Sequence, residues 1–267
     1  MTKRKKKRIN RWYIVLSVLI LLVFLLIFTN PGKYFISWLR YQSGLQKNPP
    51  EKITQIGIPL PQGFEVFGID VSRYQNNIDW LRVADFKSGR FTVEFVFIKA
   101  TEGKTLRDPS FSDNWKGAQD AGIPRGAYHY FKPGVDAEDQ ANHFCRTVKM
   151  VKGDLPPVLD IEETARGMSR NALIKSLWTW LQIVERHYGV KPIVYTGAVF
   201  YETYLSGTSI EKYPLWVAHY HQNRPATFAK WEFWQFSDKA NIDGISGPVD
   251  VNVFFGNNDQ LIQLTRQ

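Results

Sequence analysis

From Phe64 onward, short apolar runs alternate with longer segments of helical period, and this alternation most restricts the possible fold. Apolar runs bounded by turn residues are typical of buried strands, and the segments between them are typical of helices. The pattern predicts strand–helix units around a mainly parallel sheet. The eight expected strands are 65–71, 95–100, 126–131, 157–161, 192–196, 215–219, 232–236 and 249–254.

Helices are expected after each of the first five strands, at 78–86, 112–121, 137–148, 170–188 and 198–205. The clearest pattern lies in 170–188, where Leu173, Leu177 and Leu181 belong to an apolar stripe with three- and four-residue steps. The last three strands are joined by short links that leave little room for helices. The sequence therefore predicts an α/β fold, an irregular TIM-like (β/α)5(β)3 barrel.

One long apolar run, residues 12–28, precedes this region and contains no charged residue. Its 17 residues are enough for a helix that spans a bilayer. A cleavable signal peptide is the alternative, and it requires a small-residue cleavage site. Thr29-Asn30-Pro31 follows the run instead, and no Ala-x-Ala motif is present. We therefore expect an N-terminal transmembrane signal anchor at 12–28.

The residues before this run, 1–11, hold seven basic side chains and no acid. The positive-inside rule places such a basic flank in the cytoplasm. We expect a single-pass protein of the cytoplasmic (inner) membrane with its N-terminus inside and its folded domain in the periplasm or outside the cell. The proline- and glycine-containing segment 29–63 is expected to be a stalk or linker, and 64–267 to be the folded domain.

The net charge of +9 comes from the N-terminal segments. Residues 63–267 carry 23 basic and 24 acidic side chains, so the folded domain is close to neutral. A basic surface is the main sequence sign of a nucleic-acid-binding domain, and it is absent from this region. We expect no nucleic-acid partner.

Acidic residues stand at the ends or starts of several expected strands, namely Asp70, Asp160, Glu162 and Asp250. In β/α barrels, the C-terminal ends of the strands carry the active site. Asp160 and Glu162 are two residues apart on an expected strand and so face the same side. An Asp-x-Glu pattern also occurs at a surface strand edge, but burying two carboxyl groups is costly unless they serve a site or find partners. Two acids with different pKa values are what glycosidic bond cleavage needs.

The chain carries eight motifs in a fixed order, and with them it resembles glycoside hydrolase family 25, the Chalaropsis-type lysozymes or N-acetylmuramidases. The motifs are Gly68-Ile69-Asp70-Val71-Ser72, Ile98-Lys99-Ala100-Thr101-Glu102-Gly103, Gly126-Ala127-Tyr128-His129-Tyr130-Phe131, Leu159-Asp160-Ile161-Glu162, Ile193-Val194-Tyr195-Thr196-Gly197, Leu215-Trp216-Val217-Ala218, Trp234-Gln235-Phe236 and Val249-Asp250-Val251-Asn252. The resemblance covers about residues 64–256. It implies the same barrel with five β/α units and three further strands.

The resemblance also implies roles for the acids. Glu162 is expected to be the general acid that protonates the glycosidic oxygen between muramic acid and glucosamine, with Asp160 as its partner. In the substrate-assisted route proposed for the family, the muramic 2-acetamido oxygen attacks the anomeric carbon and the net outcome is retention. Asp70 and Asp250 are expected at the floor of the same cleft, where a neighbouring negative charge raises the pKa of an acid.

Five aromatic residues are candidates for contacts with the sugar rings: Tyr128, Tyr130, Tyr195, Trp216 and Trp234. Each of them is equally compatible with a place in the barrel core. The resemblance implies peptidoglycan glycan strands as the substrate, no cofactor and no metal, and we expect a monomer.

Two other functions stay open at this stage. A metal-dependent hydrolase on the same barrel would use the acids as oxygen ligands for Mg²⁺ or Ca²⁺. The sequence has no His-x-His or His-Glu-x-x-His spacing that would indicate zinc. A membrane-tethered barrel that binds peptidoglycan without cleaving it is the second alternative, and the complete set of acids argues against it.

Overall fold

The computed structural model describes residue 12 and residues 55–222, 224–225, 227 and 229–265. The chain divides into two units, Met1–Pro49 and Pro50–Gln267. The basic flank 1–11, the expected anchor 12–28 apart from Trp12, and residues 29–54 of the expected linker lie outside the described residues. Within the part of the chain that is described, no helix is long and apolar enough to cross a membrane.

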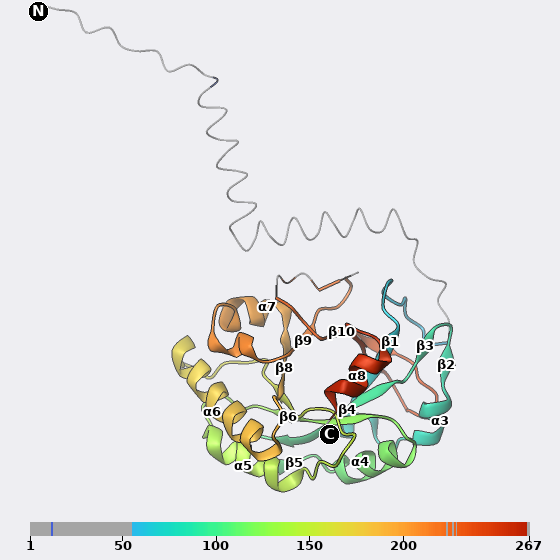
Figure 1. The fold of residues 1–267 in the computed structure, drawn as a ribbon, viewed down its shortest axis with the longest axis horizontal. Coiled ribbons are helices and arrows are strands. Elements are labelled where there is room, and N and C mark those ends of the chain that lie inside the picture. Colours follow the sequence, from blue (N-terminus) through green and yellow to red (C-terminus); the bar gives the residue numbers. More distant parts are fainter. Residues whose placement is uncertain (1–11, 13–54, 223, 226, 228, 266–267) are drawn as a thin grey trace, which may run out of the picture. The chain divides into compact units, whose positions relative to one another are not determined.

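Eight strands form a closed barrel in the second unit (Figure 1). They are β1 (Val66–Val71), β4 (Phe95–Glu102), β6 (Arg125–Tyr130), β7 (Val158–Asp160), β8 (Ile193–Gly197), β9 (Leu215–Ala218), β10 (Phe233–Ala240) and β11 (Val249–Phe254). The barrel closes because β1 pairs with β4 on one side and with β11 on the other. Neighbouring strands run parallel except at β11, which is antiparallel to both β1 and β10. All eight expected strands are confirmed.

A helix follows each of the first five barrel strands, as the sequence predicts. These are α3 (Trp80–Asp85), α4 (Phe111–Asp120), α5 (Ala137–Thr147), α6 (Arg170–Tyr188) and α7 (Ala198–Phe200), the last continuing into the π-helical turn η2 (Tyr201–Leu205). Figure 1 shows them in chain order around the barrel. The (β/α)5(β)3 architecture is therefore confirmed.

Helix α6 shows how local signals set these elements. The Ser169 side chain accepts a hydrogen bond from the backbone N–H of Ala172 and caps the first turn. Gly189, with φ 75°, ends the helix in the left-handed conformation that glycine adopts without strain. The apolar stripe between these two ends is buried against the barrel.

Several short elements complete the unit. They are η1 (Arg73–Gln75), β2 (Lys87–Ser88), β3 (Phe91–Thr92), β5 (Leu106–Arg107), η3 (Ser209–Lys212) and α8 (Asn258–Leu264). Helix α8 is not foreseen from the sequence. Its Leu261 is buried in the same apolar cluster as Val66 and Phe254, which lie at the start of β1 and the end of β11. Helix α8 therefore covers the end of the barrel at which the parallel strands begin (Figure 1).

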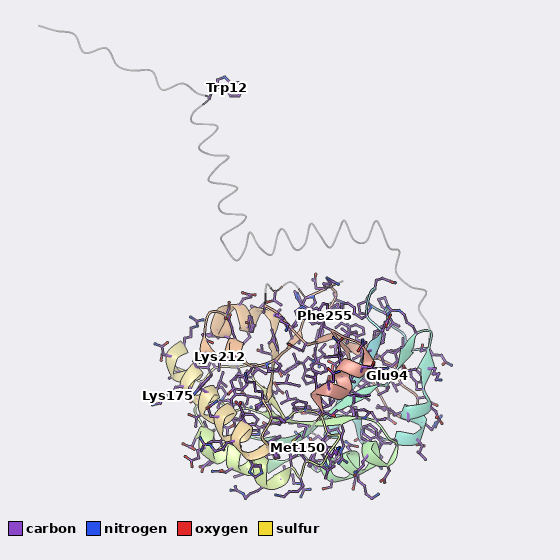
Figure 2. The ribbon with its side chains drawn as sticks, viewed as in Figure 1. Trp12, Glu94, Met150, Lys175, Lys212 and Phe255 are labelled. Carbon is purple, nitrogen blue, oxygen red and sulfur yellow. The ribbon has the colours of Figure 1, made fainter. Side chains whose placement is uncertain are left out.

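Aromatic rings fill the barrel interior. Phe97 stacks on Trp216 with a centroid distance of 4.6 Å, and Phe95 packs edge-on against Phe233. Gly68 and Gly126 face these rings, and a Cβ atom there would lie 2.5 Å and 2.6 Å from the rings of Phe95 and Phe97. The two glycines therefore make room for the aromatic interior. Side chains also occupy the space between the strands and the surrounding helices (Figure 2).

The segment before β1 belongs to the folded unit and corrects the expected domain boundary. Ile56, Ile58 and Leu60 are buried in the core, and the backbone N–H of Asn241 donates to the carbonyl of Ile56. The Arg90 guanidinium donates to the carbonyls of Pro61 and Phe64. The described part of the expected linker, residues 55–63, therefore packs on the barrel, and the folded unit starts before Phe64.

Candidate active site

A pocket of about 210 Å³ lies at the C-terminal ends of the parallel strands. Its lining residues are Asp70, Tyr128, Asp160, Glu162, Tyr195, Trp216, Tyr220, Gln235 and Asp250. The four acids predicted from the sequence therefore meet in one cavity, although they are separated by up to 180 residues along the chain. Their place in the pocket is a structural finding, while their catalytic roles stay predictions.

Strand register explains how the acids come together. Asp70 near the end of β1 lies opposite Asp250 at the start of the antiparallel β11. Asp160 is the last residue of β7 and pairs with Tyr195 of β8 and Tyr130 of β6. Glu162 follows just beyond the strand, after Ile161, whose backbone N–H donates to the carbonyl of Tyr195.

The carboxyl groups of Asp160 and Glu162 are neighbours, and each of them affects the pKa of the other. Burial raises the pKa of Asp160 well above its usual value, and the charge of Glu162 raises it further. Glu162 stands at the solvent-exposed mouth of the pocket, yet protein around its carboxyl group removes water, and this desolvation raises its pKa. The pair can hold a proton that neither acid would keep alone in water.

Asp70 is buried and receives two hydrogen bonds. Gln235 Nε2 and Asn252 Nδ2 each donate to Asp70 Oδ2 at 2.8 Å. The pKa of Asp70 is raised to about 6. Burial is the largest cause, the two amide donors act in the opposite direction, and the charge of Glu162 adds to the rise. Across the β1–β11 pair, burial and then the charge of Asp70 raise the pKa of Asp250 to about 8.

The five aromatic candidates occupy different places. Tyr128, Tyr195 and Trp216 line the pocket. Tyr130 lies outside this lining, where its ring is contacted by the ammonium groups of Lys99 and Lys132 at 4.8 Å and 4.7 Å. Three of the five aromatic candidates therefore meet in the pocket, and Tyr130 and Trp234 do not line it.

The structure contradicts the prediction that Trp234 contacts the sugar rings. Its side chain is fully buried on the outer face of β10, against Phe64 and Phe236. Its Nε1 donates to the carbonyl of His219. Because successive strand residues face opposite sides, Gln235 points into the pocket and Trp234 points away from it. Trp234 is a packing residue with no surface to offer a sugar.

Two polar residues of the pocket, Tyr220 and Gln235, are missing from the sequence-derived site. Gln235 stands inside the motif Trp234-Gln235-Phe236, so the sequence carries a signal for it. Lys99 belongs to another of the eight motifs. In the structure it pairs with Glu102 at 2.8 Å, and its charge lowers the pKa of both Asp160 and Glu162, against the larger effect of burial.

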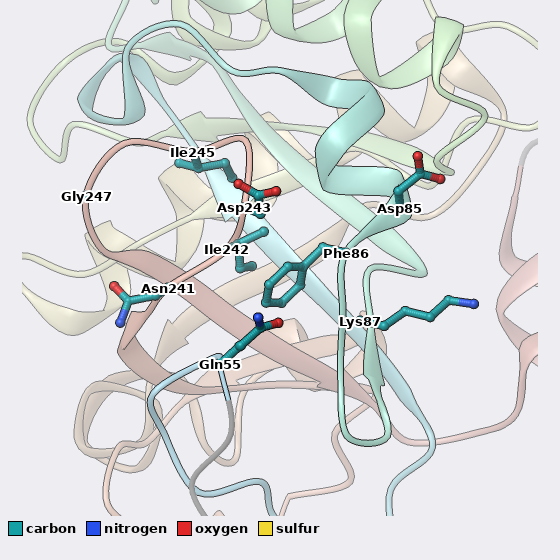
Figure 3. Close-up of a pocket in the computed structure, with 9 residues that line it drawn as sticks. All are labelled: Gln55, Asp85, Phe86, Lys87, Asn241, Ile242, Asp243, Ile245 and Gly247. Carbon is teal, nitrogen blue, oxygen red and sulfur yellow. The ribbon is translucent and has the colours of Figure 1, made fainter.

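A larger cavity of about 710 Å³ lies beside α3 and the β10–β11 loop (Figure 3). It contains Asp85 and Asp243 on separate elements, and Asp243 is ion-paired with Arg82 at 2.6 Å. No cluster of facing carboxyl groups lines this cavity, so the smaller pocket is the candidate active site. Across residues 55–222 and the described part of 224–265, no three His, Cys, Asp or Glu side chains are grouped to hold a metal.

Comparison with known proteins is consistent with this geometry. The family described as Glycosyl hydrolases family 25 matches residues 69–245. The protein YegX of Escherichia coli strain K12 is 49% identical over 210 residues, which cover 78% of this chain and 76% of that protein. Lysozyme M1 of Streptomyces globisporus is 34% identical over 250 residues, with 88% and 82% covered. The solved bacterial lysozyme from Streptomyces coelicolor aligns with a TM-score of 0.70 and 32% identity, over 77% of this chain and 99% of that one.

Proposed function

The chain belongs to glycosyl hydrolases family 25, and from this membership we propose that it is a lysozyme. It hydrolyses the β-1,4 bond between N-acetylmuramic acid and N-acetylglucosamine in peptidoglycan. The observation that carries the proposal is the pocket itself, in which four carboxyl groups with raised pKa values meet. The names of relatives such as Lysozyme M1 support the same substrate.

We propose that Glu162 donates its proton to the glycosidic oxygen as the bond to the anomeric carbon breaks. The 2-acetamido oxygen of the muramic residue attacks this carbon from the opposite face and forms an oxazolinium intermediate. Water then attacks the same carbon, Glu162 takes the water's proton, and the product keeps the original anomeric configuration. The raised pKa of Glu162 supports this role, because it keeps the carboxyl group protonated further toward neutral pH than in an ordinary glutamate.

Asp160 is proposed to orient the acetamido group. Its Oδ1 is buried and has no hydrogen-bond partner among the described residues. A buried oxygen without a partner is costly, and an N–H donor from a ligand would satisfy it. The acetamido N–H of the substrate is a donor of this kind. A hydrogen bond from it to Asp160 Oδ1 would aim the acetamido oxygen at the anomeric carbon.

The proposed activity is tested by digesting purified peptidoglycan with the full-length chain in mild detergent, followed by borohydride reduction and mass spectrometry. We expect reduced muramic acid at the new ends, because the bond on its anomeric side is cleaved. In the same digest, proton NMR at early times should show the β-anomer of the new end, as retention requires.

Other products would contradict this proposal in distinct ways. Reduced glucosamine ends would identify a glucosaminidase, and an early α-anomer would exclude retention. Loss of cleavage in EDTA would indicate a metal-dependent hydrolase. Peptidoglycan that binds without being cleaved, also after O-deacetylation, would indicate a binding protein.

We further propose that residues 12–28 anchor the enzyme in the cytoplasmic membrane, with the barrel on the outer side. The basic flank and the uncharged run of 17 residues support this topology. The full-length protein should stay in the membrane fraction after an alkaline carbonate wash, and protease added to spheroplasts should digest the barrel. A soluble protein that lacks residues 1–28 would instead show cleavage of a signal peptide.

A further inference from the structure

The two amides on Asp70 are themselves held by other pocket residues. The Trp216 indole Nε1 donates to Asn252 Oδ1 at 2.8 Å. The hydroxyls of Tyr195 and Tyr220 donate to Gln235 Oε1 at 2.8 Å and 2.6 Å. Each amide therefore accepts hydrogen bonds on its oxygen and donates to Asp70 through its nitrogen.

This arrangement fixes which way the Asn252 amide points. An indole N–H can only donate, so the group that faces it must be the oxygen of Asn252. The nitrogen of Asn252 is then turned toward Asp70, where it can only donate. Asn252 therefore favours the carboxylate form of Asp70 over the protonated form at this oxygen.

Both amides reach the same oxygen of Asp70, and this leaves the other oxygen for the cavity. Within the described residues, no group donates a hydrogen bond to Asp70 Oδ1, and Asp70 lines the pocket. No lysine or arginine in the described part of the chain forms a salt bridge with Asp70. The two amides are thus the groups that offset the burial of this carboxylate.

We propose that Asn252 and Gln235 are positioning residues that hold Asp70 as an anion with Oδ1 directed at the substrate. Trp216 acts through Asn252, and Tyr195 and Tyr220 act through Gln235. This inference rests on the proposed glycosidase function, in which positive charge develops at the anomeric carbon during cleavage. A fixed carboxylate oxygen in the pocket stabilises such charge without having to reorganise.

The other titratable groups that face Asp70 do not stabilise its carboxylate. They are Tyr128, Asp160, Glu162, Tyr195, Tyr220 and Asp250. All of them are neutral or negative, so none offsets the charge of Asp70. On the adjacent strand β4, the cation Lys99 is paired with Glu102 and not with Asp70. Removing one amide donor should therefore shift the Asp70 titration to higher pH.

The test is Asn252→Leu in the full-length chain, which keeps the branched shape of the side chain and removes the donor. Asp70 is followed by carboxyl carbon NMR in protein labelled with ¹³C at the aspartate side-chain carboxyl, and its signal is identified by its loss in Asp70→Asn. We expect the Asp70 midpoint to rise by about one pH unit. The acidic limb of kcat/KM should move upward equally, so that kcat/KM one unit below the original midpoint falls about fivefold to tenfold.

Trp216→Phe is the second variant and covers the case in which Asn252→Leu does not fold, because it removes the indole N–H that holds Asn252 and keeps an aromatic ring at this position. It should move the Asp70 midpoint in the same direction by a smaller amount. Trp178→Phe is the matched control, since Trp178 lies on α6 away from the pocket, and it should leave the midpoint unchanged. A uniform loss of kcat/KM with an unmoved midpoint in the folded variants would overturn the inference. If the midpoint moved in a protein without muramidase activity, the positioning of Asp70 by the two amides would be supported and the proposed function would be contradicted.

Discussion

Glu162→Gln is expected to lower kcat for peptidoglycan cleavage by about 10²–10⁴-fold, the range that a positioned general acid contributes. The amide keeps the size of the side chain but has no comparably acidic proton to give to the leaving oxygen. Glu162 stands at the pocket mouth, where desolvation raises its pKa, so the substitution removes an acid that is both accessible to the substrate and protonated further toward neutral pH than an ordinary glutamate. Turnover is measured by the release of reducing ends from purified peptidoglycan.

The neighbouring Glu163 gives a matched control. Glu163→Gln makes the same chemical change one residue further along, at an exposed side chain that pairs with Lys132 at 2.9 Å. An exposed ion pair contributes little to stability, and Glu163 does not line the pocket, so this variant should keep close to full activity. If Glu162→Gln retained more than about a tenth of the activity while folded, another residue would have to be the acid.

The barrel itself was predictable because its strands are buried runs separated by segments of helical period. All eight strands and five helices follow from this alternation. The short elements were not predictable in the same way. Helix α8 has a mixed polar sequence in which Leu261 provides the buried contact, and this is too little apolar periodicity to mark a helix.

The segment before β1 carries a burial signal in its sequence that its prolines obscure. Ile56, Ile58 and Leu60 alternate with exposed residues, as expected for a chain with one buried side. The prolines at positions 59 and 61 favoured a linker. Packing against the barrel outweighs that local preference, because burial of three aliphatic side chains stabilises the segment by several kcal/mol, at about 1.5–3 kcal/mol each.

Within the site, the acids were predictable and the groups that hold them were not. Strand ends in a β/α barrel collect at one face, so Asp70 and Asp160 could be placed together from topology alone. Asp250 lies at the start of its strand, and it reaches the same face because β11 runs antiparallel to β1. The choice between Trp234 and Gln235 depends on which face of β10 turns inward. The two residues are adjacent, and a shift of one residue exchanges their faces. Only the observed pairing of β10 with its neighbours decides this.

A buried ion pair at the opposite end of β6 carries the largest expected effect on stability. Arg125 Nε donates to Asp154 Oδ1 at 2.9 Å, and the two side chains are only 4% and 5% exposed. The guanidinium also lies over the ring of Trp115 at 4.0 Å and donates to the Trp115 carbonyl. Asp154→Ala leaves this charge buried without its partner and should lower the free energy of unfolding by about 3–5 kcal/mol. For a domain of this size, that corresponds to a fall in Tm of about 6–20 °C.

This loss should affect stability and not the chemistry, because Arg125 begins β6, whereas the pocket lies at the other end of the strands. Below the lowered Tm, the Asp154→Ala enzyme should keep its kcat, as measured beside a thermal unfolding curve. Asp120→Ala removes the exposed partner of Lys116 and should cost about 0–1 kcal/mol, as surface pairs do. The double variant Arg125→Met/Asp154→Leu should recover part of the loss, since replacing both charges with apolar side chains leaves none unpaired. A double variant as unstable as Asp154→Ala would mean that the aromatic and carbonyl contacts of Arg125, and not the unpaired charge, account for the loss.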